Sequence, residues 1–415
     1  MRRPTLSPEP PPGPETGLNR RLRIGILFGG RSGEHEVSLI SAASLLRALD
    51  PEKYEVIPIG ITREGQWRVG ATPRQLAAEP ERLLAAVLGQ GRSVRASADP
   101  TGPRLVPVEP GSRSAPGARL DVIFPVLHGT FGEDGTVQGL LELAGIPYVG
   151  AGVLASAAGM DKDAMKRLFR DAGLPVVEWM LLLRADWELN PRAWVRRIVR
   201  RLGTPLFVKP ANLGSSVGIS KVTSARDLPR ALDLAARYDR KIIVEKGLDA
   251  REIECSVLGN DQPVASLPGE IVPVNEFYDY EAKYLKEGSE LIIPAKLSKR
   301  QTREVQQFAV RAFRAIDGAG MARVDFLLDR PSGRLYVNEI NTIPGFTPIS
   351  MYPKLWQASG LPYPQLIDRL VSLALERHAE KHRSLFQYDV PAKLQPAPGD
   401  GPPDKRTRKG RIKAG

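Results

Sequence analysis

Residues 321–341 read MARVDFLLD-RPSGR-LYVNEIN, and this stretch decides how the chain is interpreted. Two runs rich in β-branched, aromatic and other apolar residues flank a turn-forming segment that contains proline and glycine. If the turn is centred on Ser332, the loop comprises the five residues Arg330–Arg334, a common length for a β-hairpin. The stretch therefore predicts two antiparallel strands.

Polar side chains meet on one face of this predicted hairpin. In the register set by the turn, Asp325 faces Glu339 and Arg323 faces Asn341. Successive strand residues point to opposite faces, so all four side chains share one face. Two facing carboxylates and an amide oxygen suit Mg²⁺, with phosphates as further ligands. The spacing predicts a metal site, and the alternative is a polar surface on which the arginine neutralises the acids.

A second motif, LFVKPANLGSSVGISKV, covers residues 206–222. A strand ends at Lys209-Pro210, and a glycine- and serine-containing loop leads to the next strand. Such a loop offers backbone N–H groups to an anion, and the lysine adds a positive charge. No GxxxxGK[ST] sequence occurs. The motif indicates a flap over phosphates, whereas the alternative is an ordinary turn.

Two further motifs follow predicted strands of the first 150 residues. GGRSGEHEVS (29–38) places Glu34 at the start of a helix, where an acid can also serve only the helix dipole. VLHGTFGEDGTVQG (126–139) places His128 at a strand end, where a lone histidine is usually structural. Together they put a histidine, acids and glycines at the carboxyl ends of parallel strands, where α/β sheets bind ligands.

Composition and charge limit the functional classes. The chain has 415 residues, of which 42% are hydrophobic, and no apolar run long enough to span a membrane. Of the net charge of +12, residues 1–23 hold +3 and residues 393–415 hold +5, which argues against a uniformly basic nucleic-acid-binding body. The single cysteine, Cys255, and an N-terminus without an apolar signal segment fit a cytoplasmic location.

Hydrophobic periodicity predicts an α/β chain between two disordered tails. The expected parts are a tail (1–21), an N-terminal parallel α/β domain (22–150), a central domain (151–248), a C-terminal domain with the hairpin (249–390) and a basic tail (391–415). Within the first domain, residues 70–118 are expected to form a helix at Ala77–Leu88 and a loose insertion. The first helix of that domain is expected at Ser38–Leu49.

Seven motifs in this order resemble the D-alanine–D-alanine ligases of the ATP-grasp superfamily. They are GGRSGEHEVS, HGTFGEDGTVQG, MDKDAMK, VKPANLGSSVGISKV, EFYDYEAKYL, MARVDFLLD and VNEINTIPGFTPISMYP. The resemblance extends from about Arg23 to Leu375 and leaves out the tails. It implies the ATP-grasp architecture, in which a Rossmann-like N-terminal domain accompanies two α+β domains that clamp the nucleotide.

The resemblance also implies a role for individual residues. Glu34 would hold the first substrate's ammonium group, with His128 against the same amino acid, and Ser215 and Tyr284 would bond to Glu34 in a closed lattice. The nucleotide would be held by Lys162, Lys209, Glu245, Lys246, Leu248 and Glu252. The transferring phosphate, the oxyanion and the second substrate would be held by Lys283, Arg323, the Gly345 N–H, Ser350 and Met351. The metal ligands would be Asp325, Glu339 and Asn341.

The implied reaction joins two D-alanines at the cost of ATP, through an acyl phosphate, and uses two Mg²⁺ or Mn²⁺ ions. The partners expected are D-alanine, ATP and a second copy of the chain, with no specific nucleic acid and no membrane insertion. Three alternatives remain at this stage: a D-alanine–D-lactate ligase, a nucleic-acid-binding protein, and an ATP-binding regulator without turnover.

Overall fold

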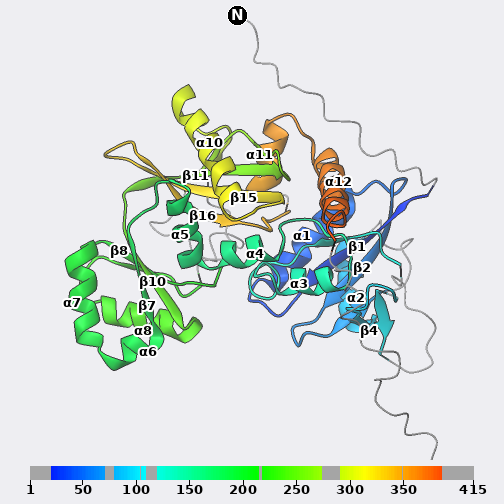
Figure 1. The fold of residues 1–415 in the computed structure, drawn as a ribbon, viewed down its shortest axis with the longest axis horizontal. Helices are drawn as coiled ribbons and strands as arrows, with labels where there is room; N and C mark the ends of the chain where they lie inside the picture. The colour runs from blue at the N-terminus through cyan, green and yellow to red at the C-terminus, as the bar shows by residue number, and fades with distance from the viewer. Residues whose placement is uncertain are drawn as a thin grey trace, which may run out of the picture. The chain divides into compact units, whose positions relative to one another are not determined.

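A computed structural model describes residues 20–70, 79–102, 104–108, 119–214, 217–272, 290–347 and 349–385. The three β-sheets of the described residues belong to one compact unit, Met1–His378 (Figure 1). Each sheet is built largely from one stretch of the chain, so the sheets are taken in turn.

The first sheet has the strand order β5-β4-β3-β2-β1-β6. Strand β1 pairs in parallel with β2 and β6, as the alternation of strands and helices predicts, and β3 to β5 extend the sheet in antiparallel fashion. Its elements are β1 (Leu22–Gly29), α1 (His35–Ala48), β2 (Tyr54–Ile61), β3 (Trp67–Val69), α2 (Pro80–Gln90), β4 (Arg92–Ala96), β5 (Leu105–Pro107), β6 (Val122–Pro125) and α3 (Thr136–Leu143).

Two expectations for this part of the chain need correction. The predicted loose insertion at 70–118 contains β4 and β5, which lengthen the sheet, although residues 71–78 and 109–118 lie outside the described part. The short alternation in RSVRA, the sequence of β4, was too weak to reveal a strand. Helix α1 begins at His35 instead of Ser38, and Glu34 is its N-cap residue, at the start of a helix as its motif predicted.

The second sheet has the strand order β7-β10-β8-β9, all antiparallel. It is preceded by α4 (Val153–Met160) and α5 (Lys162–Asp171), and its own elements are β7 (Trp179–Leu183), α6 (Arg184–Leu189), α7 (Pro191–Leu202), β8 (Leu206–Pro210), β9 (Ser220–Val222), α8 (Leu228–Tyr238) and β10 (Lys241–Lys246). Val208 and Val244 pack under the helices in one apolar cluster. Because strand residues alternate, Lys209 and Glu245 point to the opposite face.

The third sheet contains the hairpin and has the strand order β14-β13-β11-β15-β16, with β12 paired to β11. Its elements are β11 (Ala250–Gly259), β12 (Val264–Ala265), β13 (Gly269–Val272), β14 (Glu290–Ile292), α10 (Lys299–Ala315), β15 (Gly320–Asp329), β16 (Leu335–Asn341), α11 (Met351–Ala358) and α12 (Tyr363–Lys381). The loop between β15 and β16 comprises Arg330–Arg334, as predicted.

A β-bulge at Asn338 changes the phase of β16. Asp325 pairs with Glu339 as predicted, but Phe326 pairs with Val337, so the predicted register fails nearer the turn. The bulge lets Leu335 and Val337 enter the apolar core while Glu339 faces the polar side. Without it, strict alternation would put Val337 and Glu339 on the same face.

Deleting Asn338 should therefore cost little stability, since Val337 and Glu339 become neighbours and ordinary alternation still puts them on opposite faces. Deleting Tyr336 is the matched control: it puts Leu335 and Val337 on opposite faces and should destabilise the protein by about 2 kcal/mol or more. The measurement is denaturant unfolding of the full chain. Equal losses of stability in the two deletion variants would mean that the bulge does not set the phase.

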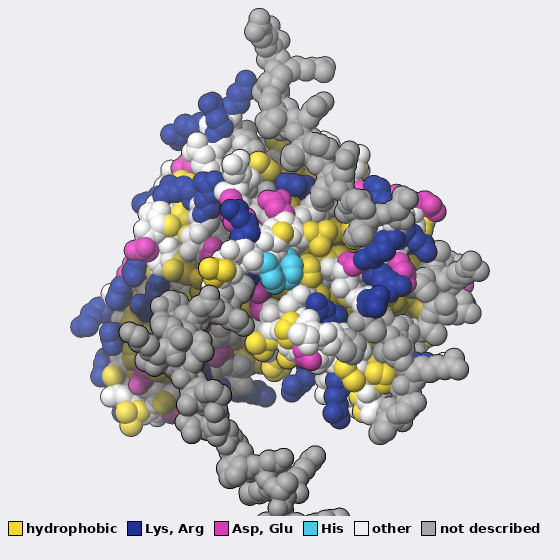
Figure 2. All heavy atoms as spheres, turned by 45° about the vertical axis from the view of Figure 1, so that its right-hand side comes forward, with side chains coloured by type: hydrophobic (Ala, Val, Ile, Leu, Met, Phe, Trp, Pro, Cys, Tyr) yellow, Lys and Arg dark blue, Asp and Glu magenta, His cyan; other side chains and the backbone are white. Residues whose placement is uncertain are grey.

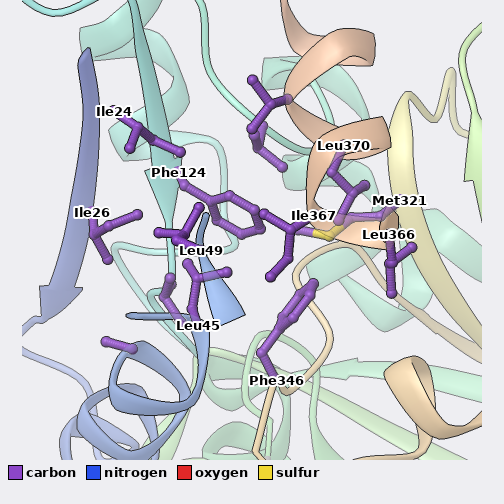
Figure 3. Close-up of a cluster of buried hydrophobic side chains, with 14 of the residues drawn as sticks. Ile24, Ile26, Leu45, Leu49, Phe124, Met321, Phe346, Leu366, Ile367 and Leu370 are labelled. Atoms are coloured by element: carbon purple, nitrogen blue, oxygen red, sulfur yellow. The ribbon is translucent and has the colours of Figure 1, made fainter. Parts of the chain in front are cut away.

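The largest apolar core joins the first sheet to the end of the chain. Figure 3 shows Ile24, Ile26 and Phe124 of that sheet beside Leu366, Ile367 and Leu370 of α12. Phe346, in the loop after β16, meets the ring of Phe124 edge-on at 5.5 Å between centroids. This contact holds the loop after the hairpin against the first sheet. Among the helices of the described ranges, none has the length and apolarity needed to cross a membrane.

Candidate active site

Three carboxylates lie in one row across the third sheet. Glu254 of β11 lies opposite Asp325, and Asp325 lies opposite Glu339. The neighbouring row pairs Arg323 with Asn341. The facing pairs predicted from the hairpin are thus present, and Glu254 is an addition. Its place depends on the pairing of β11 with β15, whose paired residues lie about 70 positions apart in sequence.

Arg323 neutralises this row. Its Nε and Nη2 donate to the two carboxylate oxygens of Asp325, each over 2.7 Å, and its Nε lies 3.0 Å from Oε2 of Glu254. Burial disfavours the charged guanidinium, but the charges of Asp325 and Glu254 outweigh it and hold the pKa of Arg323 well above its usual value. Arg323 is therefore a permanent positive charge fixed within the site.

The donor set fits a cation that brings part of its own coordination shell. Asp325 and Glu339 offer carboxylate oxygens and Asn341 offers an amide oxygen, the hard donors that Mg²⁺ takes together with substrate phosphates. Among the described residues, no three acidic, histidine or cysteine side chains could hold an ion by themselves. The Asn341 amide donates to Asp325 over 3.0 Å, beside the arginine. In the structure Asp325 is thus neutralised by Arg323, as in the alternative of a polar hairpin surface. Metal binding stays a prediction.

Three lysines gather near the row. Lys162 lies 3.6 Å from Oε2 of Glu339, and Lys209 lies 2.7 Å from Oε2 of Glu245. Lys166, one turn after Lys162 in α5, lies 3.2 Å from Oε1 of Glu245 and is 1% exposed. Positions four apart in a helix share a face, so the spacing within MDKDAMK is enough to put Lys166 beside Lys162.

Local structure positions these lysines. The side chain of Asp161 caps α5 by accepting from the backbone N–H groups of Asp163 and Ala164, which fixes the start of the helix at Lys162. The Lys162 Nζ also donates to the carbonyl of Leu213 over 2.9 Å, in the loop that the sequence assigns to phosphates. The predicted phosphate lysine and the predicted phosphate loop are therefore in contact.

Glu245 organises the cationic group. Burial alone would raise the pKa of its carboxyl, but Lys166 and Lys209 outweigh burial and lower that pKa to about 2. Burial lowers the pKa of Lys166. For Lys209, burial also opposes the charge, but Glu245 and Glu339 prevail and raise its pKa. The cluster is suited to an anion beside Lys162 and Lys209.

The other residues predicted to hold the nucleotide lie at the end of β10 and the start of β11. Lys246 is exposed, whereas Leu248 and Glu252 are half-buried. Glu245 is held by lysines, so the structure gives it a structural role beside its predicted contact with adenine. The adenine and ribose contacts stay predictions.

A second cluster lies where β1 and β6 end. The carboxylate of Glu34 lies against two glycines: a Cβ atom would stand 2.6 Å from its Oε2 at Gly129 and 3.2 Å at Gly214. Only a residue without a side chain allows the first approach, and Gly129 also has a φ of +74°. The first motif thus meets both the histidine motif and the phosphate loop.

His128 is held from both sides of its ring. Its Nδ1 lies 3.1 Å from the carbonyl of Ile343, and its Nε2 lies 3.1 Å from Oγ of Ser41. A carbonyl only accepts, so Nδ1 carries the proton and Nε2 accepts from the serine. Burial lowers the pKa of His128 and outweighs the charge of Glu34, so the ring is neutral near pH 7. His128 therefore acts as a positioned neutral group.

Glu133, in the same glycine-rich loop, is a titratable group that the predicted site omitted. Its Oε2 accepts from the backbone N–H of Gly129 over 2.7 Å. Removal from water, followed by the charge of Glu34, raises the pKa of Glu133 to about 8. The sequence showed Glu133 beside His128, but not that it would share its surroundings with Glu34.

This shift predicts how stability depends on pH. Between about pH 4.5 and 8 the folded protein binds a proton at Glu133 that the unfolded chain releases, so Glu133 lowers stability as pH rises through this window. In Glu133→Gln, the thermal midpoint should fall less steeply from pH 5 to 8 than in the parent. Glu52→Gln, at an exposed turn, is the matched control and should keep the parent's slope. A parent-like slope in Glu133→Gln would contradict the prediction.

The loop after β16 forms the remaining part of the site. Ser350 Oγ accepts from the N–H of Thr347 over 3.0 Å and lies 2.7 Å from that residue's hydroxyl. At Gly345 a Cβ atom would stand 2.7 Å from Ser350 Oγ. Met351 begins α11, and its side chain is buried against Ile271. The backbone of this first turn, and not the methionine side chain, is what Met351 can offer a carboxylate.

Three predicted site residues, Ser215, Lys283 and Tyr284, lie outside the described residues. Their roles stay predictions. So does the influence of Tyr284 on the choice between an amide and an ester product.

Comparisons with known proteins show the family of the chain. The chain matches the model of the "D-ala D-ala ligase N-terminus" over residues 23–151 and that of the "D-ala D-ala ligase C-terminus" over residues 168–372. It is 54% identical over 361 residues to a D-alanine–D-alanine ligase of Heliobacterium modesticaldum, covering 87% of this chain and 96% of the relative. A relative of the same name from Geobacillus kaustophilus is 50% identical, with 89% of this chain and 98% of the relative covered.

Solved structures are also similar. The D-alanine–D-alanine ligase of Coxiella burnetii has a TM-score of 0.75 at 40% identity, covering 88% of this chain and 96% of that one. A D-Ala:D-Ser ligase of Enterococcus faecalis has the same TM-score at 36% identity, covering 86% and 100%. The predicted ATP-grasp fold is confirmed by this similarity. On the two family models and on relatives matched over nearly their whole length, the chain belongs to the D-alanine–D-alanine ligase family of ATP-dependent ligases.

Proposed function

We propose that the chain joins two D-alanine molecules, with ATP as co-substrate, to give D-alanyl-D-alanine, ADP and phosphate for cell-wall synthesis. One observation carries the proposal. Asn341, in the row next to the carboxylates, is two residues from Ile343, whose carbonyl holds His128 beside Glu34. A single short segment thus connects a site suited to phosphates with a site suited to an amino acid.

The reaction divides into two steps that need positioning more than covalent help from the protein. A carboxylate oxygen of the first D-alanine takes the γ-phosphoryl group, which gives an acyl phosphate and ADP. The uncharged amine of the second D-alanine then attacks the acyl carbon, the C–O bond to phosphate breaks, and the amine loses a proton. Charge neutralisation around the phosphoryl group and the oxyanion is the main task of the side chains.

The cationic side chains divide between these steps. Lys162 and Lys209 would neutralise the nucleotide phosphates, while Lys166 keeps Glu245 ionised beneath them. Arg323 would stabilise the oxyanion of the tetrahedral intermediate together with the Gly345 N–H. Because Arg323 keeps its charge at every relevant pH, it needs no proton transfer to act.

The amino-acid cluster would hold the first D-alanine. Glu34 would accept the ammonium group, with neutral His128 beside the same substrate. The turn formed by Thr347 and Ser350 at the start of α11 would receive the carboxylate of the second D-alanine.

Asp325, Glu339 and Asn341 would hold Mg²⁺ or Mn²⁺, two ions by the family resemblance. Bound there, the metal supplies charge neutralisation between the nucleotide phosphates. The support is the donor chemistry of the facing carboxylates and the distance of 3.6 Å between Glu339 and the Nζ of Lys162.

The proposal also covers the oligomeric state, the cellular location, the domain limits and the choice of second substrate. We expect a homodimer in a cytoplasmic location, with domain limits near residues 150 and 248, and size-exclusion chromatography with light scattering tests the first of these. A D-lactate-using enzyme is not favoured, because the relatives reported above at 50% identity or more are D-alanine–D-alanine ligases.

The deciding experiment measures phosphate release from ATP and Mg²⁺ with and without D-alanine, and identifies the product by mass spectrometry. D-serine and D-lactate are offered in separate reactions and in competition. D-alanine-dependent phosphate release with dipeptide as the main product supports the proposal. ATP turnover that is independent of D-alanine, or no turnover, would overturn it.

A further inference from the structure

The positive charge of the body is concentrated in one part of the chain. Residues 174–248, which form the second sheet and its helices, contain fourteen Lys and Arg against seven Asp and Glu, a net charge of +7. Residues 24–392 as a whole have a net charge of only +4, so the rest of the body is slightly acidic. Figure 2 shows one face of the molecule, on which Lys and Arg side chains stand at several separate places.

Much of this charge lies on helix α7, PRAWVRRIVRRL. Its five arginines are all exposed, at positions 192, 196, 197, 200 and 201. Residues four apart in a helix share a side, so Arg192, Arg196 and Arg200 form a row about 12 Å long. Like charges at this spacing repel each other and weaken the helix.

Few acidic groups compensate this row. Arg201 pairs with Glu178 over 3.0 Å, and Arg197 lies over the ring of Trp194 at 4.8 Å. Within the described ranges Arg192, Arg196 and Arg200 form no ion pair. The row is therefore free to meet an external anion.

A hollow of about 640 Å³ beside α7 adds room for a polar group. Arg192 and Arg196 line it together with Trp187, and the acids Glu188 and Asp233 line it too. Asp233 accepts the indole N–H of Trp187 over 2.8 Å, which occupies one of its oxygens. The hollow thus has a cationic and an anionic side, and Arg192 and Arg196 of α7 form the cationic side.

An apolar side chain stands next to the arginines. Leu189, the last residue of α6, is 85% exposed. The apolar side of α7 itself is not available, because Ile198 and Leu202 are buried in the core of this part of the chain. Helix α7 and the end of α6 therefore present a cationic surface with one protruding aliphatic group, and α7 cannot turn over to insert into a bilayer.

We propose that the α7 face, defined by Leu189, Arg192, Arg196 and Arg200, docks the protein reversibly on a bilayer surface that carries anionic phospholipids. Arginines match phosphate groups, and each cationic side chain near such a surface adds attraction. Leu189 favours a bilayer over a nucleic acid, since an exposed aliphatic group gains burial at the lipid interface but has no partner on a phosphate backbone.

Docking in this way leaves the active site accessible. Helices α6, α7 and α8 lie together beside β7 and β10 in Figure 1, and they cover the face of the second sheet that contains Val208 and Val244. Lys209 and Glu245 belong to the opposite face of the same strands. The proposal goes beyond the ligase activity and does not depend on it.

The test is co-sedimentation of the full chain with vesicles of phosphatidylglycerol and phosphatidylcholine, compared with phosphatidylcholine alone, at about 0.1 M salt. The parent should bind only the anionic vesicles. The triple variant Arg192→Gln, Arg196→Gln, Arg200→Gln should bind about 100-fold more weakly, from about 1 kcal/mol for each charge lost. Leu189→Ser should bind about tenfold more weakly.

A matched control separates this face from net charge and from the basic tails. Lys299→Gln, Arg300→Gln, Arg303→Gln on α10 removes the same three charges from another exposed surface and should bind like the parent. All variants should have a thermal midpoint no lower than about that of the parent and should keep its phosphate-release rate. Equal losses in both triple variants, or none in the α7 variant, would overturn the proposal. If Leu189→Ser binds the anionic vesicles as tightly as the parent and single-stranded RNA competes with them, the proposal is overturned. The face would then bind polyanions in general.

Discussion

Glu339→Gln should reduce turnover at least ~10²-fold, about 2.7 kcal/mol of transition-state stabilisation, while the protein stays folded. The substitution keeps the volume of the side chain and removes a charge that faces Asp325 directly and lies 3.6 Å from Lys162. A glutamine offers a metal ion only a neutral oxygen. The measurement is D-alanine-dependent phosphate release across a range of Mg²⁺ concentrations.

Glu304→Gln makes the same chemical change on helix α10, away from the carboxylate row, and should leave turnover unchanged. If Glu339→Gln works within threefold of the parent at saturating Mg²⁺, the hairpin is only structural and the acids serve Arg323 alone. If a higher Mg²⁺ concentration partly restores the turnover of Glu339→Gln, Glu339 is assigned to ion binding.

Arg323→Lys should lower kcat by about 10²- to 10³-fold with a smaller change in the KM for ATP. The guanidinium holds both oxygens of Asp325 and reaches Glu254, and a lysine has neither the length nor the planar fork to do both. The substitution keeps the positive charge, so a lower kcat would show that the geometry of the guanidinium group matters as well as its charge. Steady-state kinetics with each substrate varied in turn make the measurement.

Arg330→Lys, in the exposed loop of the same hairpin, is the matched control and should keep the parent's kcat. Because removal of Arg323 could leave acids unpaired in the sheet, thermal unfolding of each variant must accompany the kinetics. A folded Arg323→Lys enzyme with the parent's kcat would remove Arg323 from the proposed oxyanion site.

Short-range pattern was sufficient for much of the fold and for half of the site. The loop Arg330–Arg334 follows from local turn chemistry and occurs as predicted. The opposition of Asp325 and Glu339 follows from a hairpin alone, since the two strands are adjacent in the chain. Where the local signal was weak, as in β4 and β5 of residues 70–118, the prediction was wrong.

Charge summed over long stretches hid information as well. The net charge of residues 24–392 is small because the positive charge of residues 174–248 and the negative charge of the remainder partly cancel. The sum therefore does not show where the positive charge lies. Only the structure shows that the arginines of α7 are all exposed on one helix and so form a cationic surface.

The sequence by itself determined the family, the order of the motifs and the residue types available for phosphate and metal chemistry. Only the tertiary structure decided which of them meet. Glu254 joins Asp325 through a strand pairing that spans about 70 residues, and His128 meets the carbonyl of Ile343 across 215 positions. The pKa values of Glu133, Lys166 and Glu245 depend on such meetings, because burial and neighbouring charge belong to the packed chain. Local pattern fixes the side chains an element presents, but the packing between distant elements fixes their neighbours.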